Sequence, residues 1–306
     1  MSRIVITGMG ACSAVGDTAD ACFDAFLAGT QGNAPLRHLD RARYNSVIAY
    51  ERTEPGENGG RYRSSSFLTR ALGEAVEMAG LSADDLDVQV YVGTGLRELR
   101  TVELAALAGQ TLDVSDLDFT KAVKGILPNA RQVFTLSNAC AASNYAVALA
   151  MDAIEAGAPM AIAAGCDTLT SSMFGLLDRV NPNTVDAVQV FDKNRKGVLM
   201  GDGGVALILE TEEHALANGR TPLAWLRGVG LSTDAVHETA PDKDGILGAL
   251  SDGYSRAGIT PDAVDVIYVH GTGTALNVGT EASVLATAFV NSVVLLSKYA
   301  EAQNGL

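Results

Sequence analysis

Hydrophobic runs and helical stripes of hydrophobic positions alternate along most of this 306-residue chain. Residues 4–10 are a continuous β-branched run that ends in a glycine turn, which is the pattern of a buried strand. Residues 17–27 then space their apolar side chains as one face of a helix does, with Asp17 or Thr18 as its cap. Strands that alternate with helices predict the α/β fold class.

The alternation continues beyond the first strand and helix. Between residues 37 and 63 it gives way to Arg, Asp, Asn and Gly, and we expect a surface excursion there. The pattern then predicts helices over residues 66–80, 143–155, 212–218 and 246–257, and strands over residues 132–136, 159–165, 205–210 and 222–229.

An internal repeat links two distant segments. Residues 80–95 (GLSADDLDVQVYVGTG) align without a gap with residues 258–273 (GITPDAVDVIYVHGTG). Each copy has the pattern of a helix end, a short acidic connection, a buried strand and a glycine turn. A repeat at this distance predicts two similar halves packed about a pseudo-twofold axis. We place the first half at residues 1–190 and the second at residues 191–306.

The repeat also predicts what should follow its second copy. In the first half, a strand, a turn and a helix around Cys140 come after the repeated segment, and their counterparts would lie beyond Leu306. We therefore expect an incomplete second half. A partner subunit would cover its apolar faces, or the chain is a shortened one.

Composition and charge narrow the classes of function. The formal net charge is −14, from 22 Lys and Arg against 36 Asp and Glu. Such a chain is not expected to bind nucleic acid or an anionic membrane nonspecifically, and no apolar run approaches the 18 residues of a membrane span. The four cysteines lie far apart without C-x-x-C pairs, so we expect free thiols and a cytoplasmic protein.

Cys140 is the first candidate for chemistry. It lies between a predicted strand and a predicted helix, at or beside the N-terminus of that helix. Unpaired backbone N–H groups and the helix macrodipole favour a thiolate there. The small residues around it leave the sulfur reachable, as in a nucleophile elbow, although the G-x-S-x-G pattern is absent. The alternative is a buried structural cysteine.

His270 is the second candidate. It ends the repeated strand at a place where the first copy has the apolar Val92. A polar residue there, before a glycine turn, suggests function, and equivalent turns of two related halves would bring it towards Cys140. The alternative is a hydrogen-bonded core histidine. His237 lies in a loop that could border the same site. No residue spacing suits a metal, and no nucleotide-binding glycine loop is present.

Six motifs then point to a known family. They are residues 3–10 (RIVITGMG), 138–143 (NACAAS), 191–195 (FDKNR), 201–210 (GDGGVALILE), 234–241 (DAVHETAP) and 270–277 (HGTGTALN). In their sequence and order the chain resembles the β-ketoacyl-ACP synthases of the thiolase superfamily, the condensing enzymes of type II fatty acid and polyketide synthesis. The resemblance implies a thiolase-like duplicated α-β-α-β-α fold, and a homodimer or a heterodimer with a second ketosynthase-like subunit.

The resemblance also implies a two-stage acyl transfer. Cys140 would take an acyl group, as a thioester, from the phosphopantetheine arm of an acyl carrier protein. A malonyl thioester would lose CO₂, and its carbanion would attack the acyl-cysteine to give a 3-oxoacyl product. Covalent capture divides one difficult condensation into two easier steps. His270, as a neutral donor, would stabilise the enolate oxygen. No cofactor is implied beyond the phosphopantetheine that arrives on the carrier.

The same motifs assign roles near the C-terminus. Lys298 matches the lysine of the family's K-x-x-x-x-H segment and is a predicted catalytic residue, whereas Gln303 stands where the histidine is expected. Glutamine donates a hydrogen bond but exchanges no proton near neutral pH. The neighbouring Asn304 would give a Cys-His-Asn arrangement if the register shifted by one residue. The predicted substrate-binding residues are Thr272, Thr274, His237, Gln303 and Asn304.

Further departures keep two classes of function open. Val278 replaces an aspartate, Asp202 replaces a glutamate, and the glycine-rich C-terminal strand that completes the family's oxyanion hole is absent. Loss of one oxyanion donor costs about 10²–10³ in rate. The chain is then an enzyme that condenses or only transfers acyl groups, or a noncatalytic partner like the chain-length factors. Cys140 favours the enzyme, and Gln303 with the short C-terminus favours the transferase or the partner.

Docking of an acidic carrier protein requires local basic patches on this acidic chain. The candidates are Arg61 with Arg63, Arg97 with Arg100, and the group of Lys121, Lys124 and Arg131. An ordinary solvated surface is the alternative for each patch.

Overall fold

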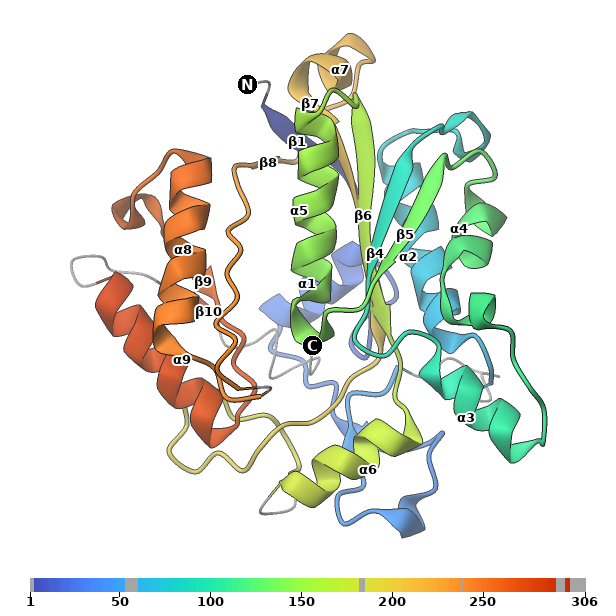
Figure 1. Cartoon of the computed structure of the whole chain (residues 1–306), viewed down its shortest axis with the longest axis vertical. Coiled ribbons are helices and arrows are strands. Elements are labelled where there is room, and N and C mark those ends of the chain that lie inside the picture. Colours follow the sequence, from blue (N-terminus) through green and yellow to red (C-terminus); the bar gives the residue numbers. More distant parts are fainter. Residues whose placement is uncertain (1–2, 53–59, 182–184, 238, 290–294, 298–306) are drawn as a thin grey trace.

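The computed structural model describes residues 3–52, 60–181, 185–237, 239–289 and 295–297. Its main element is a six-stranded sheet in the order β5-β4-β6-β7-β1-β8 (Figure 1). β4, β5 and β6 are parallel, whereas β7 runs antiparallel to both β6 and β1. The strands are β1 (Ile4–Ser13), β4 (Gln89–Gly93), β5 (Gln132–Leu136), β6 (Met160–Asp167), β7 (Gly203–Thr211) and β8 (Ala224–Leu226).

Helices cover both faces of this sheet. α2 (Arg63–Met78) packs on one face and α5 (Ala142–Glu155) on the other (Figure 1). Along β4, Val90 and Val92 join the hydrophobic cluster on the α2 side, and Tyr91 joins the cluster on the α5 side. Successive side chains of a strand point to opposite faces, so a strand covered on both faces has a continuous hydrophobic run.

The remaining elements surround this layered core. The helices are α1 (Ala19–Leu27), α3 (Leu99–Leu107), α4 (Thr120–Ile126), α6 (Ser171–Val180), α7 (Glu212–Ala217), α8 (Lys243–Ala257) and α9 (Ala275–Ala288). Two short strand pairs join β2 (Ala34–Pro35) to β3 (Ile48–Ala49) and β9 (Val266–Tyr268) to β10 (Leu295–Ser297). The 3₁₀ helices are η1 (Arg41–Arg43), η2 (Ala83–Asp85), η3 (Val114–Leu117), η4 (Ala139–Ala141) and η5 (Pro261–Ala263). Among the described helices, none has the length and apolar character that a membrane crossing needs.

Most predicted elements are confirmed. The predicted first helix is α1, for which Thr18 provides the cap by accepting a hydrogen bond from the backbone N–H of Ala21. The later predicted helices are α2, α5, α7 and α8, and the predicted strands are β1, β5, β6, β7 and β8. The hydrophobic pattern gave no prediction for α3, α4, α6 and α9.

The prediction of a surface excursion between residues 37 and 63 is wrong for part of that segment. Leu39, Ala49 and Tyr50 are buried. The Tyr50 hydroxyl accepts a hydrogen bond from the backbone N–H of Val188, and the backbone N–H of Tyr50 donates to the carbonyl of Met200. These partners lie about half the chain away in sequence, and local composition carries no information about such contacts.

The internal repeat has the same local structure in both copies. α2 is followed by Gly80 at φ +64°, and α8 by Gly258 at φ +62°. In each copy a 3₁₀ turn and a strand then follow. Each of these strands pairs in parallel with the strand that comes next in the sequence, β4 with β5 and β9 with β10. The repeated glycines end the two helices because glycine adopts the left-handed conformation without a steric penalty.

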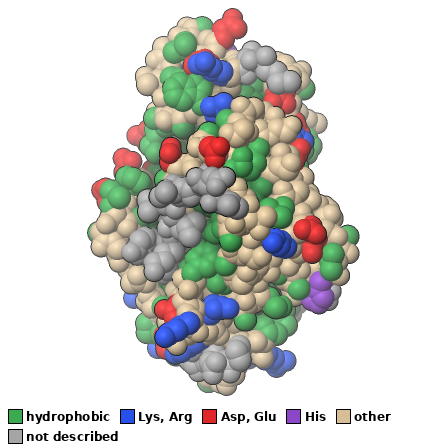
Figure 2. All heavy atoms as spheres, turned by 90° about the vertical axis from the view of Figure 1, so that its left-hand side faces the viewer, with side chains coloured by type: hydrophobic (Ala, Val, Ile, Leu, Met, Phe, Trp, Pro, Cys, Tyr) green, Lys and Arg blue, Asp and Glu red, His purple; other side chains and the backbone are tan. Residues whose placement is uncertain are grey.

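The boundary between the two halves, placed at residues 190 and 191, remains a prediction. β7 follows this boundary in the sequence and pairs with β6 and β1 of the six-stranded sheet. In the chain alone, the part of the second half that follows β8 is less deeply buried than the six-stranded sheet. No residue of α8 is fully buried, and the β9 residues Val266 and Tyr268 are exposed. Figure 2 views the side of the molecule that carries α8 and α9 and shows hydrophobic side chains at the surface.

Candidate active site

Cys140 lies in η4, between β5 and α5, and its thiol is free and exposed. The preceding residue, Ala139, has a φ of +51°. A residue other than glycine is strained in this left-handed region, and such strain is frequent at catalytic turns. No side chain caps the N-terminus of α5, so the peptide N–H groups at this end lack side-chain acceptors. The predicted strand-turn-helix is confirmed, and the alternative of a buried structural cysteine is wrong.

Two glycines let the start of α5 lie directly on the sheet. A methyl group on Gly93, the last residue of β4, would overlap with the carbonyl group of Ala142 and lie 2.5 Å from the backbone nitrogen of Ser143. A methyl group on Gly165 of β6 would overlap with the Ser143 hydroxyl. Any larger residue at either position would push the helix away, so these glycines fix the height of Cys140 above the sheet.

The other three cysteines are not available as nucleophiles. Cys12, Cys22 and Cys166 are buried. Burial raises the pKa of all three thiols, that of Cys12 to about 11, because a thiolate is poorly solvated in the protein interior. Cys140 is therefore the cysteine of this chain that a bulky thioester reaches.

His270 follows β9 and is held by a carboxylate on the next helix. Its backbone N–H donates to Glu281 Oε1 at 2.7 Å. Glu281 Oε2 accepts from the backbone N–H of Gly271 and from the side-chain amide of Asn277, both at 2.8 Å. The carboxylate thus ties the turn that carries His270 to α9. Sequence reasoning missed Glu281; the available signal was its position one helical turn after Asn277.

The glycines of the His270 turn lie against residues of the segment that precedes β7. Gly271 has a φ of +52°, and a methyl group there would lie 2.8 Å from a methyl carbon of Val190. Gly273 has a φ of +78°, and a methyl group there would lie 2.6 Å from the carbonyl oxygen of Gly197. Both positions therefore need glycine for conformation and for space.

The FDKNR motif contacts the same turn through its arginine. Arg195 donates to the carbonyl oxygen of Thr274 at 3.4 Å and to that of Ala275 at 3.2 Å. The hydroxyls of Thr272 and Thr274 are hydrogen bonded to each other at 2.9 Å. Two of the motifs that are distant in sequence thus form one unit in space, and the two predicted substrate-binding threonines belong to it.

The surroundings of the His270 ring favour its neutral form. Desolvation lowers the pKa of His270 below the ordinary histidine value, and the nearby Glu281 carboxylate opposes this shift only in part. His270 is nevertheless exposed in the chain alone. A neutral imidazole at neutral pH donates one hydrogen bond, which is what a developing enolate oxygen requires.

Two of the three predicted catalytic residues, Cys140 and His270, follow strands of different sheets. Cys140 comes after β5 of the six-stranded sheet, and His270 comes after β9 of the two-stranded sheet. Within the described residues, no hydrogen bond joins the Cys140 thiol to the His270 ring. Their proximity remains a prediction. Lys298, Gln303 and Asn304 lie outside the described residues.

His237 lies on the surface and stabilises its own loop. Its Nδ1 accepts hydrogen bonds from the backbone N–H groups of Thr239 and Ala240, both at 3.0 Å. No hydrogen bond links His237 to Cys140 or His270 within the described part of the chain.

Three of the basic residues predicted for carrier docking are exposed. Lys121 and Lys124 stand one turn apart on α4, and Arg131 precedes β5. Arg131 forms a bidentate ion pair with Asp87, with N–O distances of 2.9 and 2.7 Å. The pair lowers the pKa of Asp87 and raises that of Arg131. The two lysines therefore make the stronger basic patch.

The prediction that Arg63 and Arg100 contact a carrier protein is wrong. Arg63 is buried and forms an ion pair with Asp202 at 2.9 Å. Arg100 is buried and donates to the carbonyl oxygen of His38 at 2.8 Å. Both serve the interior because a guanidinium group satisfies several acceptors at once, so neither reaches a carrier protein.

The departures at positions 202 and 278 also have structural roles. Asp202 is fully buried and accepts hydrogen bonds from the Thr168 hydroxyl at 3.0 Å and the Leu169 backbone at 2.6 Å, besides its ion pair with Arg63. Val278 is buried in α9. Asp202 therefore ties the end of β6 to α2, whereas Val278 belongs to the buried side of α9.

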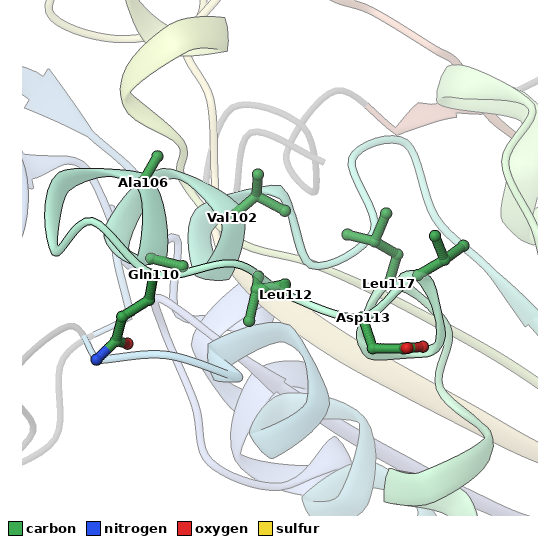
Figure 3. A pocket seen from close by; sticks show the side chains of 8 residues that line it. Val102, Ala106, Gln110, Leu112, Asp113 and Leu117 are labelled. Atoms are coloured by element: carbon green, nitrogen blue, oxygen red, sulfur yellow. The ribbon is translucent and has the colours of Figure 1, made fainter.

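A cavity of about 200 Å³ lies away from these residues (Figure 3). It is formed by α3, by η3 and by the segment between them. Its lining contains none of the predicted site residues and consists of Val102, Ala105, Ala106, Gln110, Leu112, Asp113, Val114 and Leu117. The two described candidates for catalysis, Cys140 and His270, are both exposed in the chain alone.

Family models provide the deciding comparison. Residues 1–215 match the model for the β-ketoacyl synthase N-terminal domain, and residues 223–297 match the model for the C-terminal domain. The chain belongs to the β-ketoacyl synthase family. This match confirms the family resemblance seen in the six motifs. It also confirms the predicted class of enzyme, since the β-ketoacyl synthases are acyltransferases.

Named members of this β-ketoacyl synthase family align over most of the chain. Nodulation protein E of Rhizobium meliloti (strain 1021) is 31% identical, and the alignment covers 94% of this chain and 77% of that protein. 3-Oxoacyl-[acyl-carrier-protein] synthase 2 of Vibrio cholerae is 26% identical, with 89% and 73% covered.

Solved structures give the same fold. The ishigamide ketosynthase/chain length factor superposes with a TM-score of 0.88 at 29% identity, covering 99% of this chain and 82% of that one. The AntDE:AntF complex, a ketosynthase with its type II polyketide synthase acyl-carrier protein, superposes with a TM-score of 0.84 at 22% identity, covering 100% and 82%. This β-ketoacyl synthase therefore has the predicted thiolase-like α/β fold.

Proposed function

We propose that this β-ketoacyl synthase carries acyl groups on Cys140 and condenses them with a malonyl thioester in fatty acid or polyketide synthesis. The observation that carries the proposal is the free, exposed Cys140 thiol, placed after a strained residue at the uncapped N-terminus of α5. A thiol in this position is an accessible nucleophile, and the helix N-terminus favours negative charge on the attacking sulfur and on a developing oxyanion.

In the first stage, the Cys140 sulfur attacks the carbonyl carbon of an acyl thioester on a carrier's phosphopantetheine. A new sulfur–carbon bond forms, the bond from that carbon to the pantetheine sulfur breaks, and the pantetheine thiolate leaves and takes up a proton. The acyl group stays on Cys140 as a thioester of similar energy, so the transfer needs no external energy source.

In the second stage, a malonyl thioester loses its terminal carboxylate as CO₂, and the electron pair of the broken carbon–carbon bond forms an enolate. His270 donates a hydrogen bond to the enolate oxygen, and Lys298 supplies positive charge. The enolate carbon attacks the acyl carbonyl, and the bond to Cys140 sulfur breaks. The products are a 3-oxoacyl thioester on the carrier, CO₂ and the Cys140 thiolate, which takes up a proton from water to regenerate the thiol.

The substrates are proposed to arrive on an acyl carrier protein, and phosphopantetheine is the only prosthetic group required. A carrier complex is named for AntDE:AntF, and Lys121, Lys124 and Arg131 are the residues that we expect to contact the acidic carrier here. Thr272, Thr274, His237, Gln303 and Asn304 are proposed to bind the substrate. A homodimer or a heterodimer with a second ketosynthase-like subunit, in the cytoplasm, completes the proposal.

A noncatalytic role is the second candidate. The ishigamide structure contains a chain length factor beside its ketosynthase, and Gln303 stands where the family's proton-exchanging histidine is expected. A chain with this substitution could pair with an active synthase, or could transfer acyl groups without condensing them. The presence of Cys140 favours the enzyme over the partner.

Intact-mass measurement separates these candidates. The parent chain and the variant Cys140→Ala are each incubated with acetyl- or octanoyl-loaded acyl carrier protein. Cys22→Ala, which removes a buried cysteine, is the control. We expect one acyl mass on the parent chain and on Cys22→Ala, and none on Cys140→Ala. No acyl mass on the parent chain would support the noncatalytic partner. Acylation without CO₂ release from malonyl carrier protein would identify an acyltransferase.

A further inference from the structure

The end of β6 carries a carboxylate that the mechanism above does not use. Asp167 is partly buried, and three donors converge on its two oxygens. Oδ1 accepts from the Thr94 hydroxyl at 2.9 Å and from the Leu96 backbone at 2.8 Å, and Oδ2 accepts from the Gly95 backbone at 2.8 Å. All three hydrogen-bond partners are donors, which favours a carboxylate, while burial acts in the other direction and raises the pKa of Asp167.

The turn bound by Asp167 is the glycine turn that ends the first copy of the internal repeat. Its Thr94 is buried, and the Thr94 backbone N–H donates to the carbonyl of Leu136, the last residue of β5, at 2.9 Å. The Thr94 hydroxyl also accepts from the backbone N–H of Arg97 at 2.7 Å. The turn is therefore fixed at both ends, and its central contact is the Asp167 carboxylate.

This turn lies near the residue that precedes the nucleophile. A methyl group built on Gly95 would lie 3.9 Å from the carbonyl carbon and oxygen of Ala139, an ordinary contact distance, and 3.3 Å from Asp167 Oδ2. Ala139 holds its φ of +51° without the conformational freedom of glycine. Such a conformation persists only where the surrounding structure holds it, and the hydrogen bond from Thr94 to Leu136 fixes the end of β5 three residues before Ala139.

We propose that Asp167 is a positioning residue that sets the Cys140 thiol for acyl transfer, by fixing the turn at residues 94–96, which is hydrogen bonded to the end of β5 just before Ala139 and Cys140. The inference rests on the proposed function, since it assumes that Cys140 accepts the acyl group. When the carboxylate is replaced by an amide, the turn loses at least one of its three hydrogen bonds, the end of β5 shifts with it, and the thiol leaves its place at the N-terminus of α5. Substrate binding is not expected to change, because Asp167 contacts the turn and not the substrate.

The decisive comparison uses two Asp→Asn variants. Asp167→Asn places an amide group against one of the N–H donors. Asp178→Asn is the matched control, since Asp178 likewise accepts from two backbone N–H groups, those of Asn45 and Ser46, and from one side-chain donor. Single-turnover acylation by octanoyl-pantetheine gives a maximal rate and a half-saturating concentration for each, and thermal unfolding gives the Tm.

A misplacement of about 1 Å in a reacting group costs on the order of 10²-fold in rate. We expect Asp167→Asn to lower the maximal acylation rate about 10- to 100-fold with an unchanged half-saturating concentration. Asp178→Asn should keep the parent rate even where its Tm falls equally. A parent-like rate for Asp167→Asn, or equal rate losses in both variants, would overturn the proposal.

A second variant tests the contact itself and does not remove the carboxylate. Gly95→Ala keeps Asp167 but places a methyl group 3.3 Å from its Oδ2, so the carboxylate must move by a few tenths of an ångström, and the φ of Gly95 is not in the left-handed region. We expect a slower maximal rate here as well. An unchanged rate in this variant would show that the turn does not set the thiol, and would contradict the proposal even if Asp167→Asn failed to fold.

Alkylation by iodoacetamide at pH 7 separates this inference from the proposed function. Cys140 is the exposed cysteine, so its carbamidomethylation is measured directly by mass. Slower alkylation in Asp167→Asn, but not in Asp178→Asn, supports positioning even if the parent chain gains no acyl mass, in which case only the proposed function fails. Equal alkylation rates in parent and Asp167→Asn would count against positioning.

Discussion

The Glu281 carboxylate accepts the backbone N–H of His270 at 2.7 Å and thereby joins the start of one turn to the middle of the following helix. The same carboxylate binds Gly271 and Asn277. A Glu281→Gln substitution puts an amide donor against at least one of these donors. Loss of an intramolecular hydrogen bond costs about 0.5–1.5 kcal/mol, and here it would release the turn that holds His270.

We therefore expect Glu281→Gln to slow CO₂ release from malonyl carrier protein about tenfold or more, and to leave acylation of Cys140 close to the parent rate. Glu103→Gln is the control, because Glu103 also binds two backbone N–H groups, of Ser171 and Ser172, and a side-chain hydroxyl. Equal effects on both chemical stages would argue against a specific role of this contact in placing His270.

The lowered pKa of His270 predicts a pH dependence of stability. Folding favours the neutral ring, so below the unfolded-state pKa of about 6.5 the unfolded chain binds more protons than the folded one. The contribution of His270 to stability is present above that pH and is lost as the pH falls through 6.5 towards the lower folded-state pKa. His270→Asn should lose less Tm than the parent between pH 7.5 and 5.5. Parallel Tm curves for the two proteins would contradict this prediction.

Two glycine-to-alanine changes are expected to have opposite effects on stability, because α5 packs directly on Gly93 whereas Gly73 has no close neighbour. Gly93→Ala forces a methyl group into the backbone of Ala142 and Ser143, and we expect a loss of about 1–3 kcal/mol or more, with slower acylation of Cys140. Gly73→Ala lies in α2 with no neighbour within 4 Å, and it should gain about 0.5–1 kcal/mol in stability. Denaturant unfolding of both variants measures these differences. A neutral Gly93→Ala would mean that α5 is not seated on β4 as described.

Carrier binding should depend on the two lysines of α4. Lys124→Glu reverses a charge in an exposed basic pair, and we expect it to weaken binding of an acidic carrier protein about threefold or more at low salt. The difference should shrink above about 0.15 M salt, where the Debye length is about 8 Å. Lys243→Glu, on α8, makes the same change in net charge and serves as the control in a titration. Equal weakening by both variants would point to net charge and not to this patch.

The sequence alone determined the layered α/β architecture because its information is local. The run Val90–Val92 of β4 is hydrophobic throughout, and the repeated glycines Gly80 and Gly258 end their helices for reasons of backbone conformation that any neighbourhood would share. The sequence also predicted that Cys140 lies between a strand and a helix, which the structure confirms, and its role as nucleophile remains a proposal.

Tertiary structure alone decided which polar residues serve the interior and which serve the surface. Arg63, Lys121 and Lys124 are all simply cations in the sequence. In the folded chain, Arg63 is buried against Asp202, while the two lysines remain exposed. Likewise the partners of Asp167 lie more than 70 positions away. These roles follow from contacts between distant segments, which depend on how the sheets and helices pack and leave no periodic signal along the chain.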